Sequence, residues 1–200
     1  MITLLIYIKH RFPWIWTVVE KINGRLFILL YPKLPQYESE ILESYNHAGF
    51  TFSAITDEDI PNLSEFRQNQ TRAYLSYFDP HPFDAHTLNR LLNNKSFAMM
   101  KISDDTNGNI VGYFFLRCFF IGKAFHGLIV DERYKNRGLG TSMWALSSEI
   151  CNMLGLKMYA TVSEHNIASL TSANKGTNVT VVDKLANDYL LIECRHKTKI

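Results

Sequence analysis

The chain has few cysteines for its length of 200 residues. Cys118, Cys151 and Cys194 are far apart, and no two of them are spaced as C-x-x-C. An odd number of distant cysteines is not typical of a disulfide-stapled secreted domain or of a zinc site. We therefore expect no disulfide framework, no bound metal and a reducing, cytoplasmic location.

The chain also lacks a strong excess of one charge and a long apolar run. Its 21 Lys and Arg residues and 19 Asp and Glu residues give a formal net charge of +2, whereas nucleic-acid-binding domains usually carry a clustered basic face. The apolar run over residues 2–8 ends at Lys9, well short of the roughly 18 residues that a membrane span needs. No basic region precedes that run, so we expect neither a signal peptide nor a membrane span, and no nucleic-acid partner.

The composition predicts one globular domain with an N-terminal extension. We place the extension and its connector at residues 1–48 and the domain at residues 49–200. Pro13 suits the first turn of a helix, and Asn23-Gly24 predicts its end. The first 35 residues are apolar and carry five cations, Lys9, Arg11, Lys21, Arg25 and Lys33, against Glu20 alone.

Two interpretations of this extension stay open. We favour one in which the apolar segment packs against the main domain or a second subunit in a homodimer, because exposed apolar surface is costly. In the other, the basic, Trp-containing segment lies on a membrane surface.

From Phe50 onward the pattern alternates between strands and helices. Residues 109–120 are apolar on both faces, which predicts a central strand. Met143, Leu146, Ile150 and Met153 recur every three or four residues, as on the buried stripe of a helix that ends at Gly155. The other predicted strands cover residues 50–56, 97–102, 123–130, 157–162, 179–183 and 189–194, and further helices cover residues 57–66, 73–78, 84–92 and 166–174.

The most informative stretch is Leu128–Ser142, LIVDERYKNRGLGTS. A strand ends at Val130, a polar turn follows, and Gly138 and Gly140 lead into the helix. Free N–H groups at a helix start attract phosphate, and glycines let a ligand approach the backbone. A dinucleotide fingerprint would need glycine at Met143, and a P-loop would need lysine at Thr141, so both are excluded. A phosphate site of another type, or only a tight strand-helix connection, remains.

The stretch GLIVDERYKNRGLGTSMW, followed by a strand and then Asn166-Ile167-Ala168-Ser169, resembles the GNAT superfamily of acyl-CoA N-acyltransferases over about residues 50–195. The resemblance implies acetyl-CoA as the cofactor. Ile129 and Val130 would pair with the pantetheine arm, and the pyrophosphate would meet the loop that follows. The residues implied for that loop are Lys135, Asn136, Arg137, Gly138, Leu139, Gly140 and Thr141, with Lys135 standing where the family usually has Gln or Arg.

The resemblance also assigns Asn166 and Ser169 to the helix start that touches the pantetheine arm. The alternative is that Asn166 is only a helix N-cap and Ser169 an ordinary helix residue. Many family members carry a tyrosine four residues after Ser169, which protonates the departing thiolate. This chain has Ala173 there, so the usual acid is missing.

The resemblance implies an α/β fold: a mixed, mostly antiparallel sheet flanked by helices and splayed after the fourth strand, here with an N-terminal helical extension. The implied function is N-acetyltransferase activity, with direct transfer of acetyl to a primary amine of a small molecule, for which an amino sugar is one candidate. A non-catalytic acyl-CoA-binding or regulatory protein is the alternative, beside a membrane-surface or dimerising role for residues 1–35.

Attack by an amine requires a proton acceptor. The strand over residues 123–130 has no carboxylate, and His126 is its one group that titrates near neutrality, so His126 is the first candidate base. Glu164 and His165, just after the fifth strand, come next. The alternative for His126 is an ordinary core histidine, and the alternative for Glu164 and His165 is a solvated loop.

Overall fold

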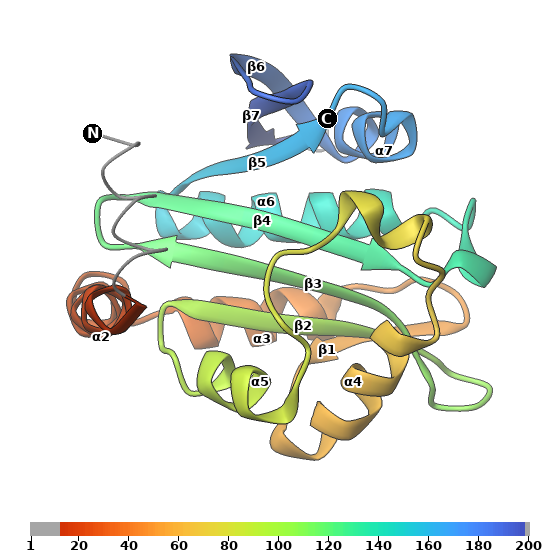
Figure 1. Ribbon diagram of the computed structural model, residues 1–200, viewed down its shortest axis with the longest axis horizontal. Coiled ribbons are helices and arrows are strands. Elements are labelled where there is room, and N and C mark those ends of the chain that lie inside the picture. The colour runs from red at the N-terminus through yellow and green to blue at the C-terminus, as the bar shows by residue number, and fades with distance from the viewer. Residues whose placement is uncertain (1–12, 199–200) are drawn as a thin grey trace.

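The structure, a computed structural model, describes residues 13–198, with side chains from residue 18 onward. Two helices open this part of the chain, and seven strands alternate with helices after them (Figure 1). The helices are α2 (Pro13–Leu30), α3 (Leu34–Ser44), α4 (Ile60–Gln68), α5 (Ala85–Leu92), α6 (Leu139–Leu154) and α7 (Ile167–Gly176), with short 3-10 turns η1 (Asp57–Asp59), η2 (Tyr74–Tyr77) and η3 (Glu132–Tyr134). The strands are β1 (Phe50–Ala54), β2 (Phe97–Asp104), β3 (Ile110–Phe119), β4 (Lys123–Val130), β5 (Lys157–Ser163), β6 (Thr177–Leu185) and β7 (Tyr189–His196).

The strands form one sheet in the order β1-β2-β3-β4-β5-β7-β6. Every neighbouring pair is antiparallel except β4 and β5, which run parallel. The predicted mixed, mostly antiparallel sheet is therefore confirmed. So is the central position of the doubly apolar strand, because β3 lies between β2 and β4 with its residues 110–116 all buried.

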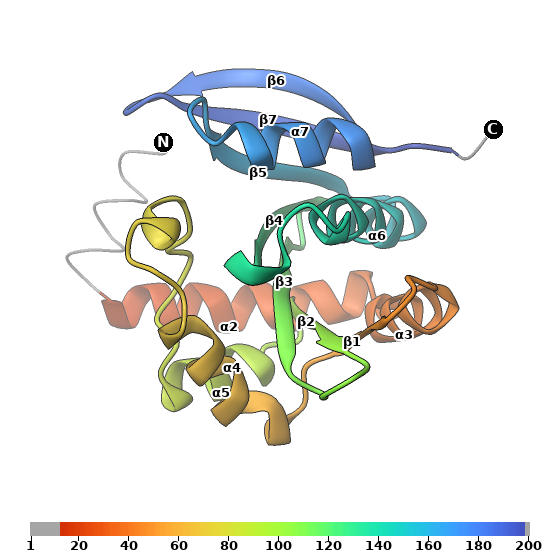
Figure 2. The ribbon, with the colours of Figure 1, turned by 90° about the vertical axis from the view of Figure 1, so that its right-hand side faces the viewer.

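Helices cover both faces of this sheet (Figures 1 and 2). Successive side chains of a strand point to opposite faces, and β3 illustrates this: Phe114 packs in the cluster that contains Met143 and Trp144 of α6. Its neighbour Tyr113 packs in the other cluster, with residues of α4 and α5. The two clusters form the layers of the core between which the sheet lies.

The predicted helix stop at Asn23-Gly24 is wrong, because α2 continues to Leu30. Asn usually weakens a helix by competing for backbone hydrogen bonds. Here the Asn23 amide is used elsewhere: its Nδ2 donates to Ser96 Oγ and to the Cys118 carbonyl, both at 2.9 Å, and its Oδ1 accepts from the Phe120 N–H at 3.1 Å. Asn23, which predicted the end of the helix, instead ties α2 to the sheet through these hydrogen bonds.

The helical character of the N-terminal extension is confirmed for its described part, residues 13–48, and the helices there share the main core. Leu34, Ile41 and Leu42 of α3 and Phe27 of α2 are all buried in the cluster beneath α6. The proposed domain boundary at residue 48 stays a prediction, and the apolar run over residues 2–8 lies outside the described residues. Among residues 13–198, no helix is long and apolar enough to cross a membrane.

Candidate functional site

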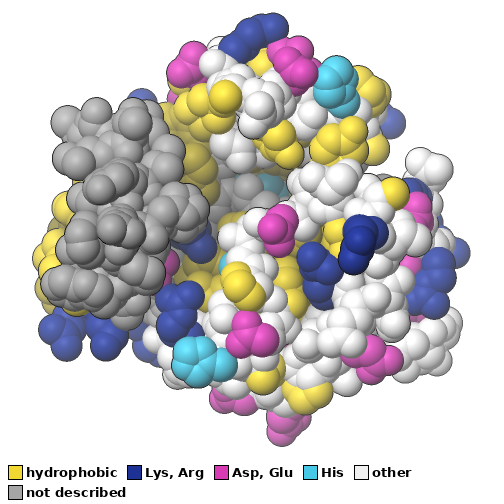
Figure 3. Space-filling view, viewed as in Figure 1, with side chains coloured by type: hydrophobic (Ala, Val, Ile, Leu, Met, Phe, Trp, Pro, Cys, Tyr) yellow, Lys and Arg dark blue, Asp and Glu magenta, His cyan; other side chains and the backbone are white. Residues whose placement is uncertain are grey.

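A cleft opens where β4 and β5 separate. The two strands pair only over residues 123–125 and 157–159, while β4 stays paired with β3 as far as Val130. The cleft has a volume of about 990 Å³ and is lined by the free parts of both strands, the β4–α6 turn, α7 and η2. Figure 3 shows the hollow between the upper part of the molecule and the part below it. The predicted splay after the fourth strand is thus present, and it opens the cleft.

The β4–α6 turn forms a cradle of backbone groups at one end of the cleft. Asn136 and Gly138 both adopt left-handed backbone conformations, with φ of 62° and 81°. The first hydrogen bond of α6 runs from the Ser142 N–H to the Gly138 carbonyl at 3.1 Å, so the N–H groups just before Ser142 have no acceptor within the helix. Such a concave run of N–H groups at a helix start suits a phosphate or pyrophosphate.

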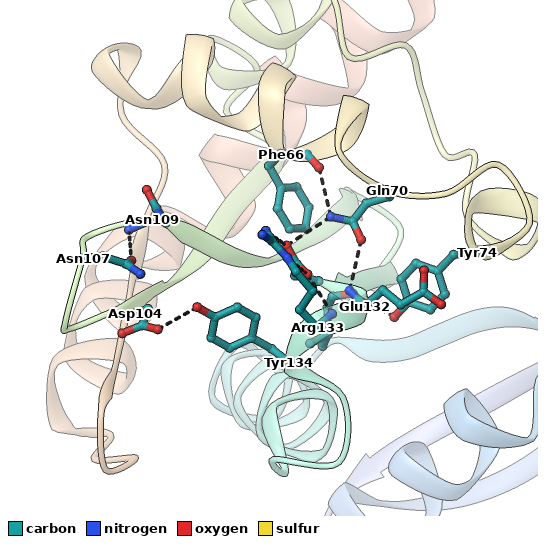
Figure 4. A network of polar contacts seen from close by, with 11 residues as sticks. Phe66, Gln70, Tyr74, Asp104, Asn107, Asn109, Glu132, Arg133 and Tyr134 are labelled. Atoms are coloured by element: carbon teal, nitrogen blue, oxygen red, sulfur yellow. Dashed lines mark hydrogen bonds and ion pairs between the residues drawn. The ribbon is translucent and has the colours of Figure 1, made fainter.

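A buried network holds this turn in place. Asp131 is 2% exposed and accepts hydrogen bonds from Arg133 at 2.7–3.0 Å and from Gln70 Nε2 at 3.3 Å. Gln70 also bonds to the Phe66 carbonyl and accepts from the Glu132 N–H (Figure 4). The hydrogen bonds from Arg133 keep the pKa of Asp131 below its usual range despite burial. The Asp131–Arg133 ion pair therefore braces the turn from within, and the neutral Gln70 side chain ties the turn to Phe66 of α4.

The cationic side chains of the cradle lie over tyrosine rings. Lys135 Nζ is 4.1 Å from the centre of the Tyr74 ring and 2.9 Å from Glu132 Oε1. The Arg137 guanidinium lies 4.8 Å from the Tyr134 ring, and the Arg137 carbonyl is 3.1 Å from His47 Nε2. Both side chains are exposed at the cleft, where they can meet an anion. Leu139, by contrast, is buried in the core, so only its backbone is available.

The start of α7 forms the opposite wall of the cleft. Asn166 is the N-cap: its Oδ1 accepts from the Ser169 N–H at 3.1 Å. Its Nδ2 has no hydrogen bond within the described chain, and both Asn166 and Ser169 line the cleft. Capping and ligand contact are thus compatible here, because they use different atoms of one amide. Ala173 is fully buried against α6 rather than facing the cleft, so the helix offers no proton donor there.

His126 lies at the floor of the cleft, one residue beyond the last β4–β5 pair. It is 5% exposed, its Nδ1 is 3.2 Å from the Phe115 carbonyl, and its ring packs 4.4 Å from that of Trp144. Desolvation lowers the pKa of His126 to about 3, so the ring is neutral at pH 7 and donates from Nδ1. Its Nε2 and the neighbouring Trp144 Nε1 are buried without a hydrogen-bond partner in the described chain.

The other two candidate bases are placed less favourably. Glu164 forms an ion pair with Lys184 at 2.7 Å and does not line the cleft. His165 lines the cleft at its rim, where its side chain is 69% exposed and 3.4 Å from Asp188.

Sequence reasoning missed the residues that η2 brings to the cleft. Tyr74, Tyr77 and Phe78 form an aromatic wall across from α7. The Tyr74 hydroxyl donates to the Val130 carbonyl at 2.7 Å, which ties η2 to the end of β4, and burial raises the pKa of this tyrosine to about 12. Tyr77 is 46% exposed, and its hydroxyl has no hydrogen bond in residues 13–198. Their aromatic run in the sequence is more typical of core, so no sequence signal identified them.

The parallel strands β4 and β5 thus splay apart beside a turn whose backbone N–H groups suit a pyrophosphate. The model of the Acetyltransferase (GNAT) family matches residues 63–171. The chain therefore belongs to this family, as its motifs suggested, and acetyl-CoA is the acetyl donor that the family uses.

Solved structures agree in fold. The GNAT domain of S. lividans PAT is 13% identical, with a TM-score of 0.61 over 71% of this chain and 88% of that one. A ribosomal-protein-S5-alanine acetyltransferase from Vibrio fischeri is 13% identical, with a TM-score of 0.60 over 76% and 95%. A spermidine N-acetyltransferase from Vibrio cholerae, in complex with CoA and spermine, is 17% identical, with a TM-score of 0.54 over 74% and 94%. No curated protein matches the chain. These identities support a shared fold and leave the substrate open.

Proposed function

We propose that this protein is an N-acetyltransferase that moves the acetyl group of acetyl-CoA to the primary amine of a small molecule. The observation that carries the proposal is the position of the amide cradle at one end of the cleft that the β4–β5 splay opens. When bound, acetyl-CoA supplies a thioester whose attack by a neutral amine gives the amide and the free thiol. The protein's task is to hold the two reactants together and to manage two protons.

One group of cleft residues would bind acetyl-CoA, and another would take part in the acetyl transfer. The N–H groups of the cradle would hold the pyrophosphate with Arg137 and Lys135 beside it, and the free Nδ2 of Asn166 would donate to the pantetheine arm. The unpaired backbone of β4 up to Val130 would pair with that arm along the splay. The backbone groups and the capping amide of Asn166 are held by the fold, so little ordering of them would be needed on binding.

His126 remains the first candidate to receive a proton or hydrogen bond from the amine. With a pKa of about 3 it is a weak base, and its Nε2 is buried, so it would accept a hydrogen bond from the amine through a water molecule, and the proton that the amine loses would pass along that water to solvent. In place of the missing tyrosine on α7, we assign Tyr77 as the donor toward the thiolate, because its hydroxyl is free at the cleft. Glu164, in its ion pair outside the cleft, is not carried into this scheme, and His165 stays a rim candidate.

The acceptor is best matched by a monoamine with an apolar body. No Asp or Glu occurs among the described residues that line the cleft, whereas Lys135, Arg137 and Lys175 do. A polyamine would bring several positive charges to a wall with nothing to balance them. An amino sugar stays a candidate, but its hydroxyls would face Tyr77, Phe78 and Ile129, which offer few hydrogen bonds.

Calorimetric titration with acetyl-CoA tests the proposal, followed by a thiol-release assay with an aromatic monoamine, an apolar monoamine, an amino sugar and a polyamine. We expect binding, and turnover highest with an aromatic or apolar monoamine, lower with an amino sugar and lowest with a polyamine. Absence of binding would refute the cofactor site in this chain. Binding without turnover on any amine would favour the non-catalytic, regulatory alternative, which the buried Ala173 keeps open. The cytoplasmic location stays a prediction.

A further inference from the structure

The outward face of α2 is apolar, which is the reverse of an ordinary surface helix. Phe27 and Asn23 face the sheet and are buried. On the opposite side, Val18, Ile22, Leu26 and Leu29 recur every three or four residues, with Val19 and Leu30 beside them, and all six are 39–76% exposed. We call these six residues the α2 stripe. At 1.5 Å per residue its span is roughly 18 Å along the helix. A continuous apolar stripe of this kind marks a docking surface.

A cationic hollow lies beside the α2 stripe. This cavity of about 460 Å³ lies between α2 and the segment that joins α5 to β2. Lys21, Arg25, Arg90 and Lys95 line it, against the single carboxylate of Glu20, which pairs with Arg90 at 2.6 Å. In Figure 3, Lys and Arg side chains gather at the lower left, where Figure 1 places α2. Three cations of the hollow thus have no ion pair within the described chain.

The two features together fit one kind of partner. A helix with an apolar face bordered by Lys and Arg is the form that lies in the interface of an anionic membrane, with its apolar side chains at the boundary of headgroups and acyl chains. A phosphate-bearing headgroup would meet the hollow. A second copy of this chain fits less well, because an isologous contact through the α2 stripe would bring the two cationic hollows toward each other.

We propose that α2 docks this protein on an anionic phospholipid surface, with the α2 stripe in the interface and the cationic hollow on the headgroup phosphates. Docking would be peripheral, since no described helix can span a bilayer. In Figures 1 and 2, β6 and β7 lie apart from α2, so substitutions on β6 fall outside the proposed contact. The inference does not depend on acetyl transfer.

Flotation of the full chain with vesicles tests this inference. Phosphatidylcholine vesicles are compared with vesicles that also contain phosphatidylserine. We expect binding to the anionic vesicles only, weakening as salt is raised. The double variants Ile22→Ser/Leu29→Ser and Lys21→Gln/Arg25→Gln should each reduce it roughly 10-fold or more. The matched control, Val181→Ser/Val182→Ser on β6, removes two side chains that are also about half exposed and should bind as the parent does.

Three outcomes would overturn the inference. One is binding that neither α2 variant weakens, which would place the contact elsewhere in the chain. Another is binding of inorganic phosphate at the hollow with no binding to anionic vesicles. The third is a dimer, measured by light scattering, that the Ile22→Ser/Leu29→Ser variant dissociates while vesicles bind nothing. Thermal melting of each variant checks that these exposed substitutions leave the fold intact.

Discussion

The two ends of the cleft are built in different ways. The cradle end consists mainly of backbone N–H groups fixed by local conformation at Asn136 and Gly138. The opposite end consists of side chains from segments far apart in the sequence: Tyr77 from η2, His126 from β4 and Trp144 from α6. A backbone site tolerates changes in sequence as long as the turn is kept, whereas a side-chain site changes its chemistry with each substitution. Variants at each end should therefore fail in different assays.

The largest effect is expected at Gly138. Its φ of 81° is strained for any other residue, and a β-branched side chain would also hold the pyrophosphate away from the backbone. We expect Gly138→Val to weaken acetyl-CoA binding roughly 100-fold by calorimetry. Gly108→Val is the matched control, because Gly108 has a φ of 72° in an exposed turn with open space around it. Equal weakening in both variants would mean that strain alone, and not the cradle, is responsible.

Two buried histidines, His126 and His81, should make the free energy of unfolding depend on pH. The pKa of His126 is about 3 and that of His81 about 4, against 6.5 for the unfolded residue. The unfolded chain therefore binds more protons, and the stability that these neutral rings contribute above pH 6.5 is lost as the pH falls through 6.5 toward 4. Each should add a slope of about 1.4 kcal/mol per pH unit to the free energy of unfolding.

Denaturant titrations between pH 6.5 and 4.5 can separate these two histidines. His126→Gln and His81→Gln should each remove one part of the slope. Only His126→Gln should also lower turnover, since His81 lies outside the cleft, where it bonds to Tyr113. Between pH 6 and 8 the pH profile of the remaining activity should keep its shape, because His126 titrates far below that range. A lost acid limb in this range would contradict the buried, neutral state.

A smaller effect is expected for Tyr77. Tyr77→Phe removes the hydroxyl and keeps the ring, so the maximal rate should fall about 10-fold while acetyl-CoA affinity stays constant. Tyr37→Phe, on α3 and away from the cleft lining, serves as the control. An unchanged rate would show that the thiolate takes its proton from elsewhere.

The smallest effect is expected for Arg137. The side chain is exposed, so its attraction to a phosphate is partly screened. Arg137→Ala should weaken acetyl-CoA binding roughly 5-fold at low salt, and the difference should shrink as salt is added. Arg195→Ala removes a cation that pairs with Glu193 away from the cleft and should bind normally. A loss at Arg137 that does not depend on salt would indicate a steric or stacking role instead.

Much of the fold could be predicted because it depends on local patterns. The apolar periods of β3 and α6 and the glycines at 138 and 155 each act within a few residues. The prediction failed at Asn23 because a distant partner decides its role: the bonds to Ser96 and Cys118 cross more than seventy residues of sequence. Tyr77 was missed for the same reason, since nothing in its own neighbourhood indicates that η2 folds over the cleft.

The sequence by itself determined the order of the helices and strands, the glycine turn of the cradle and the family. These features depend on the spacing of apolar residues and on the backbone preferences of residues that are close together in the sequence. Only the tertiary structure decided that Asn23 fastens a helix, that His126 is buried and neutral, that Glu164 is occupied by Lys184, and that α2 turns an apolar stripe outward. Burial and pairing depend on which distant segments come together. They set the pKa of a histidine and the exposure of a leucine, and neither can be read from the residue and its neighbours alone.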